Sequence, residues 1–362
     1  MGMNAFTRNK ILYHPDKIHE WMTTGSTIPL LFELDLTNAC DNFCPWCFGF
    51  SGLDRQDKTT WNVDNYGAKF TKEEAFDVVE QVANFGCKAM TLTGGGEPLV
   101  SKFCMDVIGH ITNVGMECAV ITNGNRITEE KAHIILNNCT WCRVSVDAID
   151  AEEYLREHGV KSWDKLLDNI RTLVRVKKEN NYECTIGMGY LTNGDNDGRL
   201  KGFAKLGSEL GVDYTQYRPM LVGWGTENCH YKSEDTTGII REAQDEYERD
   251  DYSVVWTEHK YEMIDANTLG RDYSVCHGES FTTVIAADKK MYVCCHMRGI
   301  EKYAIGDLTK NTVEEIWNSH QRRDALDNVD VNSFDCPPLC RHDGTNRMLH
   351  QLTVLPTHRN YI

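Results

Sequence analysis

No stretch of the sequence stays apolar for about 18 residues, the length that a membrane-spanning helix needs. The amino terminus, Met1-Gly2-Met3-Asn4-Ala5-Phe6, lacks the apolar core of a secretory signal. Phe6 also occupies the place where a myristoylation motif has serine or threonine. We therefore expect a cytoplasmic protein that has no membrane partner.

Positive charge is scarce as well. The 38 lysines and arginines are outnumbered by 54 acidic residues, and the formal net charge is −16. A polyanion such as a nucleic acid is repelled by such a surface, so we do not expect nucleic acid to be the main partner. The 41% hydrophobic and 25% charged residues are typical of a soluble globular protein, and 362 residues suffice for a large domain with a smaller one.

A disulfide framework is not expected, because the fifteen cysteines are not accompanied by a secretory signal. Metal ligation and buried free thiols are the alternatives. Eight cysteines form two groups, which are described below. The other seven have no metal-binding context, and we expect them to be buried thiols: Cys87, Cys104, Cys118, Cys139, Cys142, Cys184 and Cys229.

Short apolar runs alternate with helical patterns through the first two thirds of the chain. The expected strands are 30–36, 89–93, 117–122, 143–147, 185–191 and 214–219. The expected helices are 72–84, 101–112, 128–136, 163–178 and 197–210. This alternation predicts a parallel sheet with right-handed crossovers. We therefore expect an α/β protein with a partial (β/α)6 TIM-type barrel, and a doubly wound open sheet is the alternative.

Unusual residues gather where these strands end. In chain order they are Cys40, Cys44 and Cys47, the run Gly94 to Pro98, Asn123, Ser145, Asp147, Asn193 and Arg218. The loops at the carboxyl ends of barrel strands meet at one face, where barrel enzymes have their active sites. We therefore expect one site that collects these residues.

Three thiols follow the first strand within eight residues, in Cys40-Asp-Asn-Phe-Cys44-Pro-Trp-Cys47. Soft thiolates suit iron–sulfur clusters and zinc. Three thiolates would leave one iron of a four-iron cube open to a small ligand, and a zinc knuckle completed from elsewhere is the alternative. The C-x3-C-x2-C spacing, with Trp46 before the last cysteine, resembles the cluster loop of the radical S-adenosylmethionine (radical SAM) superfamily.

A second group of cysteines lies near the carboxyl terminus. Runs 281–286 and 291–293 flank Asp288-Lys289 and predict a hairpin, and a capping box at Thr312 and Glu315 predicts a short helix. One four-thiolate site, for iron–sulfur or zinc, can be completed by Cys276, Cys294, Cys336 and Cys340. Cys295 is the alternative to Cys294, which the hairpin register favours.

The order of these features resembles the twitch, or abbreviated SPASM, extension of radical SAM enzymes, which implies an auxiliary [4Fe–4S] cluster. The full SPASM pattern has seven cysteines and two auxiliary clusters, and its usual hairpin glycine is replaced here by Lys289. The resemblance covers about residues 29–345. It implies an N-terminal extension (1–28), a barrel (29–222), a connecting segment (223–270), a small hairpin and helix domain for the auxiliary cluster (271–345) and a C-terminal tail (346–362).

The resemblance also implies where SAM binds. Its Gly-Gly-Glu motif falls on Gly95, Gly96 and Glu97, which would hold the amino group of the methionine part. Ser145 and Asp147 match the position that contacts the ribose or the carboxylate, and Arg156 matches a carboxylate-binding arginine. A solvated helix residue is the alternative for Arg156. The remaining residues assigned to cofactor binding are Trp46, Gly94, Asn123 and Arg218.

The implied chemistry is reductive cleavage of SAM to methionine and a 5′-deoxyadenosyl radical, which takes a hydrogen atom from a substrate. The auxiliary cluster would then accept an electron, and a low-potential donor such as flavodoxin or ferredoxin would supply the first one. We expect a small polar substrate (a carbohydrate, aminocyclitol or nucleoside), because no peptide-binding domain fits before residue 29. A peptide- or protein-modifying maturase and a radical epimerase are alternatives. A non-catalytic iron–sulfur carrier and a zinc-binding module remain more distant, since neither uses Gly95 to Glu97.

Overall fold

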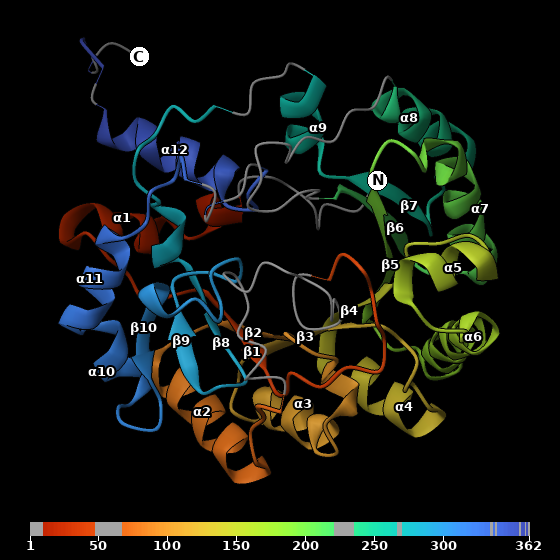
Figure 1. Cartoon of the computed structure of the whole chain (residues 1–362), viewed down its shortest axis with the longest axis horizontal. Coiled ribbons are helices and arrows are strands. Elements are labelled where there is room, and N and C mark those ends of the chain that lie inside the picture. Colours follow the sequence, from red (N-terminus) through yellow and green to blue (C-terminus); the bar gives the residue numbers. More distant parts are fainter. Residues whose placement is uncertain are drawn as a thin grey trace.

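The computed structural model describes residues 10–47, 67–220, 235–265, 270–333, 336, 339–354, 356–358 and 360 of the 362. Its strands form a ten-stranded sheet in the order β10-β9-β8-β1-β2-β3-β4-β5-β6-β7. Figure 1 shows the strands as an arc, with α2, α3, α4 and α6 on its outer side. No helix among the described residues is long and apolar enough to cross a membrane.

Seven parallel strands follow one another in chain order across this sheet. They are β1 (Leu31–Asp35), β2 (Ala89–Thr93), β3 (Glu117–Thr122), β4 (Cys139–Ser145), β5 (Thr185–Thr192), β6 (Tyr214–Pro219) and β7 (Ser253–Trp256). A doubly wound sheet would reverse its strand order at a switch point, and this sheet does not reverse between β1 and β7. The α/β partial barrel predicted from the sequence is therefore confirmed.

Helices alternate with these strands, and five of them (α2, α3, α4, α6 and α7) fall where the sequence predicts. They are α2 (Lys72–Phe85), α3 (Cys104–Asn113), α4 (Glu129–Asn138), α5 (Ala151–His158), α6 (Trp163–Asn180), α7 (Leu200–Leu210) and α8 (Thr236–Tyr247). The capping box that opens α2 forms between Thr71 and Glu74. Short 3₁₀ turns are η2 (Lys10–Tyr13), η4 (Pro98–Val100), η5 (Asp197–Arg199), η6 (Gly278–Ser280) and η7 (Glu301–Tyr303).

Two barrel elements were missed from the sequence. Strand β7 has only four residues, and it pairs in parallel with β6 inside the stretch that was expected to connect the domains. Helix α5 was also overlooked, although Asp150 caps its first turn and Gly159 ends it in a left-handed conformation. Residues 236–256 thus add a helix and a strand to the barrel within the expected connecting segment (223–270). The domain boundaries given by the sequence remain predictions.

The two faces of the arc differ in chemistry because side chains alternate along a strand. On β1, Phe32 and Leu34 belong to the main hydrophobic core, where Phe32 approaches Trp317. Glu33 and Asp35 alternate with them, and both carboxylates are buried. The inner face of the barrel therefore carries polar and charged groups that are shielded from solvent.

The C-terminal part adds its hairpin to the barrel sheet. Strand β8 (Thr282–Ile285) runs parallel to β1, and β9 (Lys290–Tyr292) and β10 (Ala304–Asp307) follow antiparallel. Lys289 in the turn has φ = 65°, a left-handed conformation that favours glycine. Its ammonium lies 2.5 Å from the Glu74 carboxylate on α2, which connects the hairpin to the barrel.

The remaining helices surround this hairpin and the barrel opening. They are α1 (Pro15–Thr24), α9 (Glu258–Asp265), α10 (Val313–Trp317), α11 (His320–Asp327) and α12 (Asp343–Thr353). The predicted capping box of Thr312 and Glu315 opens α10. Trp21 of α1 packs with Phe281 and Leu349 in a small hydrophobic cluster. The N-terminal extension is thus held against the C-terminal part.

Candidate active site at the barrel mouth

The structure places the three predicted cluster cysteines in a tight loop after β1. The Cys47 amide donates to the Cys44 carbonyl (3.1 Å), and the Asn42 amide donates to the Cys40 sulfur (3.4 Å). Burial raises the pKa of Cys40 to about 12 and raises that of Cys44 as well, and both thiols feel Cys47. A bound metal reverses such a shift because it stabilises the thiolate.

A histidine that the sequence did not reveal holds this loop. His158, at the end of α5, is only 3% exposed, and its ring stacks on Tyr154 with centroids 4.5 Å apart. Its Nε2 lies 2.9 Å from the Val146 carbonyl oxygen, and its Nδ1 lies 3.2 Å from the Asn42 amide and 3.3 Å from the Cys44 sulfur. The carbonyl can only accept, so Nε2 carries the proton and Nδ1 is the acceptor.

The contact between α5 and the loop depends on Gly159. A Cβ at this position would lie 2.6 Å from the Phe43 carbonyl oxygen, and Gly159 has φ = 68°. The Phe43 amide donates to the His158 carbonyl (2.9 Å), and the Trp46 indole donates to the Glu157 carbonyl (3.3 Å). Trp46 therefore fastens the cysteine loop to α5 in this structure.

His158→Phe keeps an aromatic ring beside Tyr154 but removes the three polar contacts of the imidazole, with Val146, Asn42 and Cys44. We expect the iron of the N-terminal cluster to be lost to a chelator about tenfold faster, since groups that orient metal ligands change metal affinity by roughly 10–100-fold. Iron release from the reconstituted protein measures this. His133→Phe is the matched control, because His133 contacts Tyr182 between α4 and α6. Equal release rates for the two variants would contradict the assignment.

The glycine run lets two backbone segments lie side by side. The Gly96 amide donates to the Thr37 carbonyl (3.1 Å), and the Glu97 amide donates to the Ala39 carbonyl (2.9 Å). A Cβ on Gly96 would lie 2.2 Å from the Ala39 oxygen, so no other residue fits there without a shift of the backbone. The predicted SAM-binding motif and the cysteine loop are thus brought together.

Glu97 is buried, and its carboxylate is fixed by three hydrogen bonds. Oε1 accepts from the Leu99 amide (2.9 Å) and the Thr122 hydroxyl (2.6 Å), and Oε2 accepts from the Asn123 amide (2.7 Å). Burial raises the pKa of Glu97 to about 7, although these hydrogen bonds act in the opposite direction. The carboxylate therefore connects the glycine loop with the end of β3, and Oε2 keeps a lone pair for a further donor.

Asn123 and Asp147 also converge on this loop. The Asn123 side chain donates to Asp41 (2.7 Å) and lies 4.0 Å from the Cys40 sulfur. Asp147 has φ = 50°, accepts from the Leu191 amide (2.7 Å) and lies 3.4 Å from Nε2 of His158. Ser145 ends β4 and is half-buried. Their predicted contacts with SAM stay proposals.

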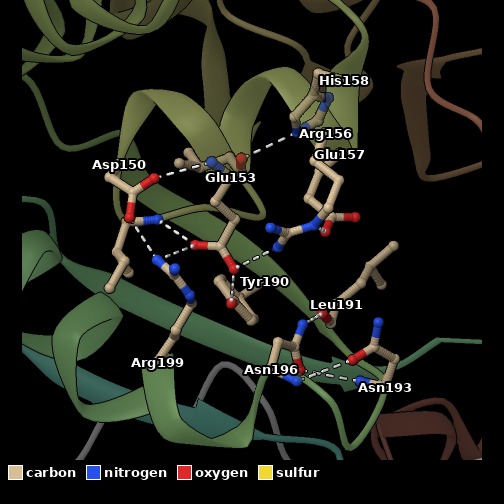
Figure 2. Close-up of polar contacts among 12 residues, drawn as sticks. Asp150, Glu153, Arg156, Glu157, His158, Tyr190, Leu191, Asn193, Asn196 and Arg199 are labelled. Atoms are coloured by element: carbon tan, nitrogen blue, oxygen red, sulfur yellow. Dashed lines mark hydrogen bonds and ion pairs between the residues drawn. The ribbon is translucent and has the colours of Figure 1, made fainter.

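Arg156 differs from the other candidates. Its side chain is 53% exposed and pairs with Glu157 (2.8 Å) and Glu153 (3.3 Å). Figure 2 shows this guanidinium beside Glu153, which also accepts from Tyr190. These contacts already satisfy Arg156, so the geometry favours the solvated helix residue over the carboxylate-binding role.

The second group of cysteines comes together beside the hairpin. Burial raises the pKa of Cys276 to about 12, and Cys340 and Cys336 add to the effect. Burial also raises the pKa of Cys294 well above its ordinary value, and the neighbouring Cys295 and then Cys340, Cys276 and Cys336 add to the effect. This mutual influence supports the predicted set of Cys276, Cys294, Cys336 and Cys340.

The neighbouring Cys295 has different surroundings. Burial raises the pKa of Cys295 to about 11, and the positive charges of Arg341 and Arg298 oppose this rise. Glu33 and Cys340 also raise it, and of these groups only Cys340 is a predicted cluster ligand. No group of three His, Cys, Asp or Glu side chains in the described residues is arranged to hold a single metal ion. The structural support for clusters is therefore the mutual influence of the thiols within each group.

Buried ion pairs connect strand β1, which precedes the first cysteine loop, with the C-terminal part that carries the second cysteine group. Arg298 donates to Glu33 (2.8 Å) and lies 3.4 Å from Asp35, and Arg341 binds the other Glu33 oxygen. Although burial alone would raise it, Arg341 and Arg298 hold the pKa of Glu33 below its ordinary value. Burial raises the pKa of Asp35 from 3.8 to about 6, against the attraction of Arg298.

The raised pKa of Asp35 predicts a pH dependence of stability. The folded state favours the protonated form of Asp35. The contribution of this carboxyl group to the free energy of unfolding is therefore fully present below pH 3.8 and is lost as the pH rises through about 6. The advantage in unfolding free energy of the native protein over Asp35→Asn should therefore shrink between pH 4 and 6, roughly the range set by the two pKa values. Urea unfolding of both reconstituted proteins at several pH values measures it. A difference that grows with pH would be the contrary result.

Comparison with known proteins agrees with this site. Residues 34–207 match the Radical SAM superfamily, and residues 276–342 match an iron-sulfur cluster-binding domain, SPASM. A parallel-sheet barrel with one three-thiol loop and one four-thiol group defines an iron–sulfur protein of the SAM-binding type. The chain belongs to the radical SAM superfamily and carries a C-terminal SPASM domain. These domains indicate [4Fe–4S] clusters and SAM as its cofactors.

Curated relatives resemble parts of the chain. An S-adenosylmethionine-dependent nucleotide dehydratase of Lacinutrix mariniflava is 30% identical over 138 residues, 36% of this chain and 26% of that protein. A probable GTP 3′,8-cyclase of Saccharolobus islandicus is 24% identical over 184 residues, 50% and 54% of the two chains. A PqqA peptide cyclase of Streptomyces rochei is 25% identical over 197 residues, 54% and 50%. The chain thus spans between about a quarter and about half of these relatives.

Solved structures share the fold. SuiB of Streptococcus suis, bound to its precursor peptide SuiA, superposes with a TM-score of 0.66 over 97% of this chain and 82% of that chain, at 10% identity. The protein anSMEcpe, with AdoMet and a Cp18Cys peptide, gives a TM-score of 0.58 over 83% and 82%, at 17% identity. At such identities the likeness shows the fold alone.

Most of the residues singled out from the sequence lie within the described part of the chain. The six thiols other than Cys229 that were expected to be buried are buried, and Cys229 lies outside the described residues. Arg218 lies on the inner face of β6, away from the loop of Cys40 and Cys44 in sequence but on the same barrel. The sequence did not reveal His158, Asn42 or Asn125. The Asn42 side chain contacts His158 and accepts a hydrogen bond from Asn125, and these contacts join segments that are far apart in the sequence.

Proposed function

We propose that the protein is a radical SAM enzyme that oxidises a small polar substrate inside the barrel. The observation that carries this proposal is the position of three thiols, Cys40, Cys44 and Cys47, in one loop whose first residues are hydrogen-bonded to the glycine loop that ends at Glu97. The chemistry supplied by the bound [4Fe–4S] cluster and SAM is reductive cleavage to methionine and a 5′-deoxyadenosyl radical, which takes a hydrogen atom from the substrate.

The residues of the chain bind and orient these groups. Cys40, Cys44 and Cys47 would hold three irons, and the Gly94 to Gly96 backbone can approach the methionine part closely because no side chain intervenes. His158 and Asn42 keep the loop in one conformation by hydrogen bonds to both sides. Fixed ligands of this kind favour a site that is arranged before SAM binds.

The auxiliary site supports an oxidative outcome. Cys276, Cys294, Cys336 and Cys340 supply a complete four-thiolate set, which leaves no iron open for SAM. Arg298 and Arg341 attach this site to Glu33 on the strand that precedes the first cysteine loop. A substrate between the two sites could therefore lose its hydrogen atom on one side and its second electron on the other. A low-potential donor such as flavodoxin or ferredoxin would supply the first electron.

The inner face of the barrel favours a small polar substrate. It presents the buried carboxylates of Glu33 and Asp35 and the half-buried guanidinium groups of Arg143 and Arg218, which suit a carbohydrate, aminocyclitol or nucleoside better than an apolar chain. Two relatives are named for nucleotide or GTP chemistry. A peptide-modifying maturase is the second candidate, favoured by the peptide cyclase relative and by the peptide-bound SuiB fold.

A substrate panel distinguishes the two candidates. The reconstituted protein is incubated with dithionite, SAM and deuterated nucleosides, nucleotides, sugars or aminocyclitols, with unrelated peptides as the comparison. We expect a small polar compound to accelerate 5′-deoxyadenosine formation and to transfer deuterium into it. Acceleration with deuterium transfer from a peptide alone would replace this proposal by the maturase.

A further inference from the structure

Two arginines lie side by side on the inner face of the barrel. Arg143 on β4 and Arg218 on β6 flank Gly189 on the strand between them. A Cβ on Gly189 would lie 3.6 Å from Cδ of Arg143 and 3.7 Å from a terminal nitrogen of Arg218. The missing side chain therefore leaves the space in which both arginine side chains meet.

Neither arginine is neutralised by a direct ion pair in the described part of the chain. Arg143 donates to the neutral amide oxygen of Gln216 (2.7 Å), and its guanidinium carbon lies 5.8 Å from the centre of the Trp141 ring. The Nε atoms of Arg143 and Arg218 are both buried without a hydrogen-bond partner among the described residues. Buried guanidinium groups normally have an acceptor at each N–H, because an unmade hydrogen bond to a charged group is costly.

The carboxylates that act on the pair are engaged with other groups. The Arg143 guanidinium and burial lower the pKa of Arg218 to about 9, and Asp147 acts in the opposite direction. Asp147 itself already accepts from the Leu191 amide and faces His158.

Glu33 is the second of these carboxylates, because Arg143 helps to lower its pKa. Its two oxygens are already paired with Arg298 and Arg341. The two inner arginines therefore share both carboxylates with other partners.

We propose that Arg143 and Arg218 bind an oxyanion of the substrate, either a phosphate ester or a carboxylate. Planar guanidinium groups bind these oxyanions with two parallel hydrogen bonds, and the buried Nε atoms supply donors for that geometry. This inference rests on the proposed function and narrows its substrate class to small polar molecules that carry an oxyanion.

The depth of Arg143 distinguishes a substrate group from the carboxylate of SAM. Arg143 lies two residues before the end of β4 and pairs with Gly187 on β5, whereas Ser145, at the end of β4, pairs with Gly189. Arg218 is level with Leu191, closer to the barrel mouth. An anion held by both arginines would thus lie below the loops that carry the cysteines and Glu97.

The test uses the reconstituted protein with saturating SAM and two probes, inorganic phosphate and succinate. We expect calorimetry to show saturable binding of at least one probe. The dissociation constant should rise about tenfold or more in Arg143→Gln and in Arg218→Gln, because charge-assisted hydrogen bonds are stronger than neutral ones. Arg171→Gln is the matched control, because this exposed arginine pairs with Asp168 on the surface of α6. The probe should also raise the unfolding midpoint of the native protein but not that of either inner variant.

Two results would overturn the inference. The first is that neither probe binds, or that all four proteins bind it equally. The second is that Arg218→Gln weakens binding of SAM about tenfold or more without weakening binding of decarboxylated SAM, which would assign the arginine to the SAM carboxylate. Formation of 5′-deoxyadenosine by the native protein is measured in parallel. If SAM is cleaved while anion binding fails, only this inference fails; if SAM is not cleaved, the proposed function fails whatever the probes do.

Discussion

Replacing Cys40, Cys44 and Cys47 together by alanine is expected to abolish cleavage of SAM. The three thiols lie in one loop, and the family to which the chain belongs uses such a loop to hold the iron that binds SAM. Iron should fall from about eight to about four atoms per chain, because the four-thiolate group of the C-terminal domain remains. Chromatography of 5′-deoxyadenosine and an iron assay on the same sample measure both effects.

The complementary triple variant, with Cys276, Cys336 and Cys340 replaced by alanine, separates the two sites. We expect it to lose the other half of the iron, to keep cleavage of SAM without substrate and to lose substrate oxidation. Cys295→Ala should keep all of the iron, because its most influential neighbours include Arg341 and Glu33 and only one predicted ligand. Cleavage that survives in the first triple variant would refute the assignment of Cys40, Cys44 and Cys47.

Arg298→Met is expected to cause the second large effect, a loss of about 3–5 kcal/mol in unfolding free energy, which is typical when one partner of a buried ion pair is removed. Arg298 contacts both Glu33 and Asp35, and all three side chains are buried. Without it, two carboxylates on β1 remain buried near one another with Arg341 as the remaining cation. Urea unfolding followed by circular dichroism measures the loss.

The matched control is Arg171→Met, which removes an exposed arginine from its pair with Asp168 and should cost less than about 1 kcal/mol. Adding Asp35→Asn to Arg298→Met should recover part of the stability, since it removes the carboxylate that loses its partner when Arg298 is replaced. A loss no greater than that of the control would mean that these ion pairs do not hold the C-terminal part against the barrel.

Much of the barrel could be predicted because its signals are local. Apolar runs such as 89–93 and the capping box of Thr312 and Glu315 depend on neighbouring residues, and both appear in the structure where the sequence places them. The spacing of Cys40, Cys44 and Cys47 is local as well. Strand β7 was missed because four residues give too short an alternation to recognise.

The supporting parts of the site could not be predicted, because they depend on contacts between distant segments. His158 lies 114 residues from Cys44, and Arg143 lies 73 residues from its partner Gln216. Only the fold brings them together. The choice between Cys294 and Cys295 is likewise informed by three-dimensional surroundings, in which Cys294 feels the other three predicted ligands. Lys289 shows the reverse case, since it occupies a left-handed turn position that favours glycine.

The central claim is tested most directly by anaerobic reconstitution with iron and sulfide, followed by dithionite and SAM and by chromatography for 5′-deoxyadenosine. We predict that 5′-deoxyadenosine forms and that the protein carries about eight irons per chain, as expected for two four-iron clusters. Zinc in place of iron, or intact SAM with a fully reduced protein, would contradict the account and would favour a zinc-stabilised binding module.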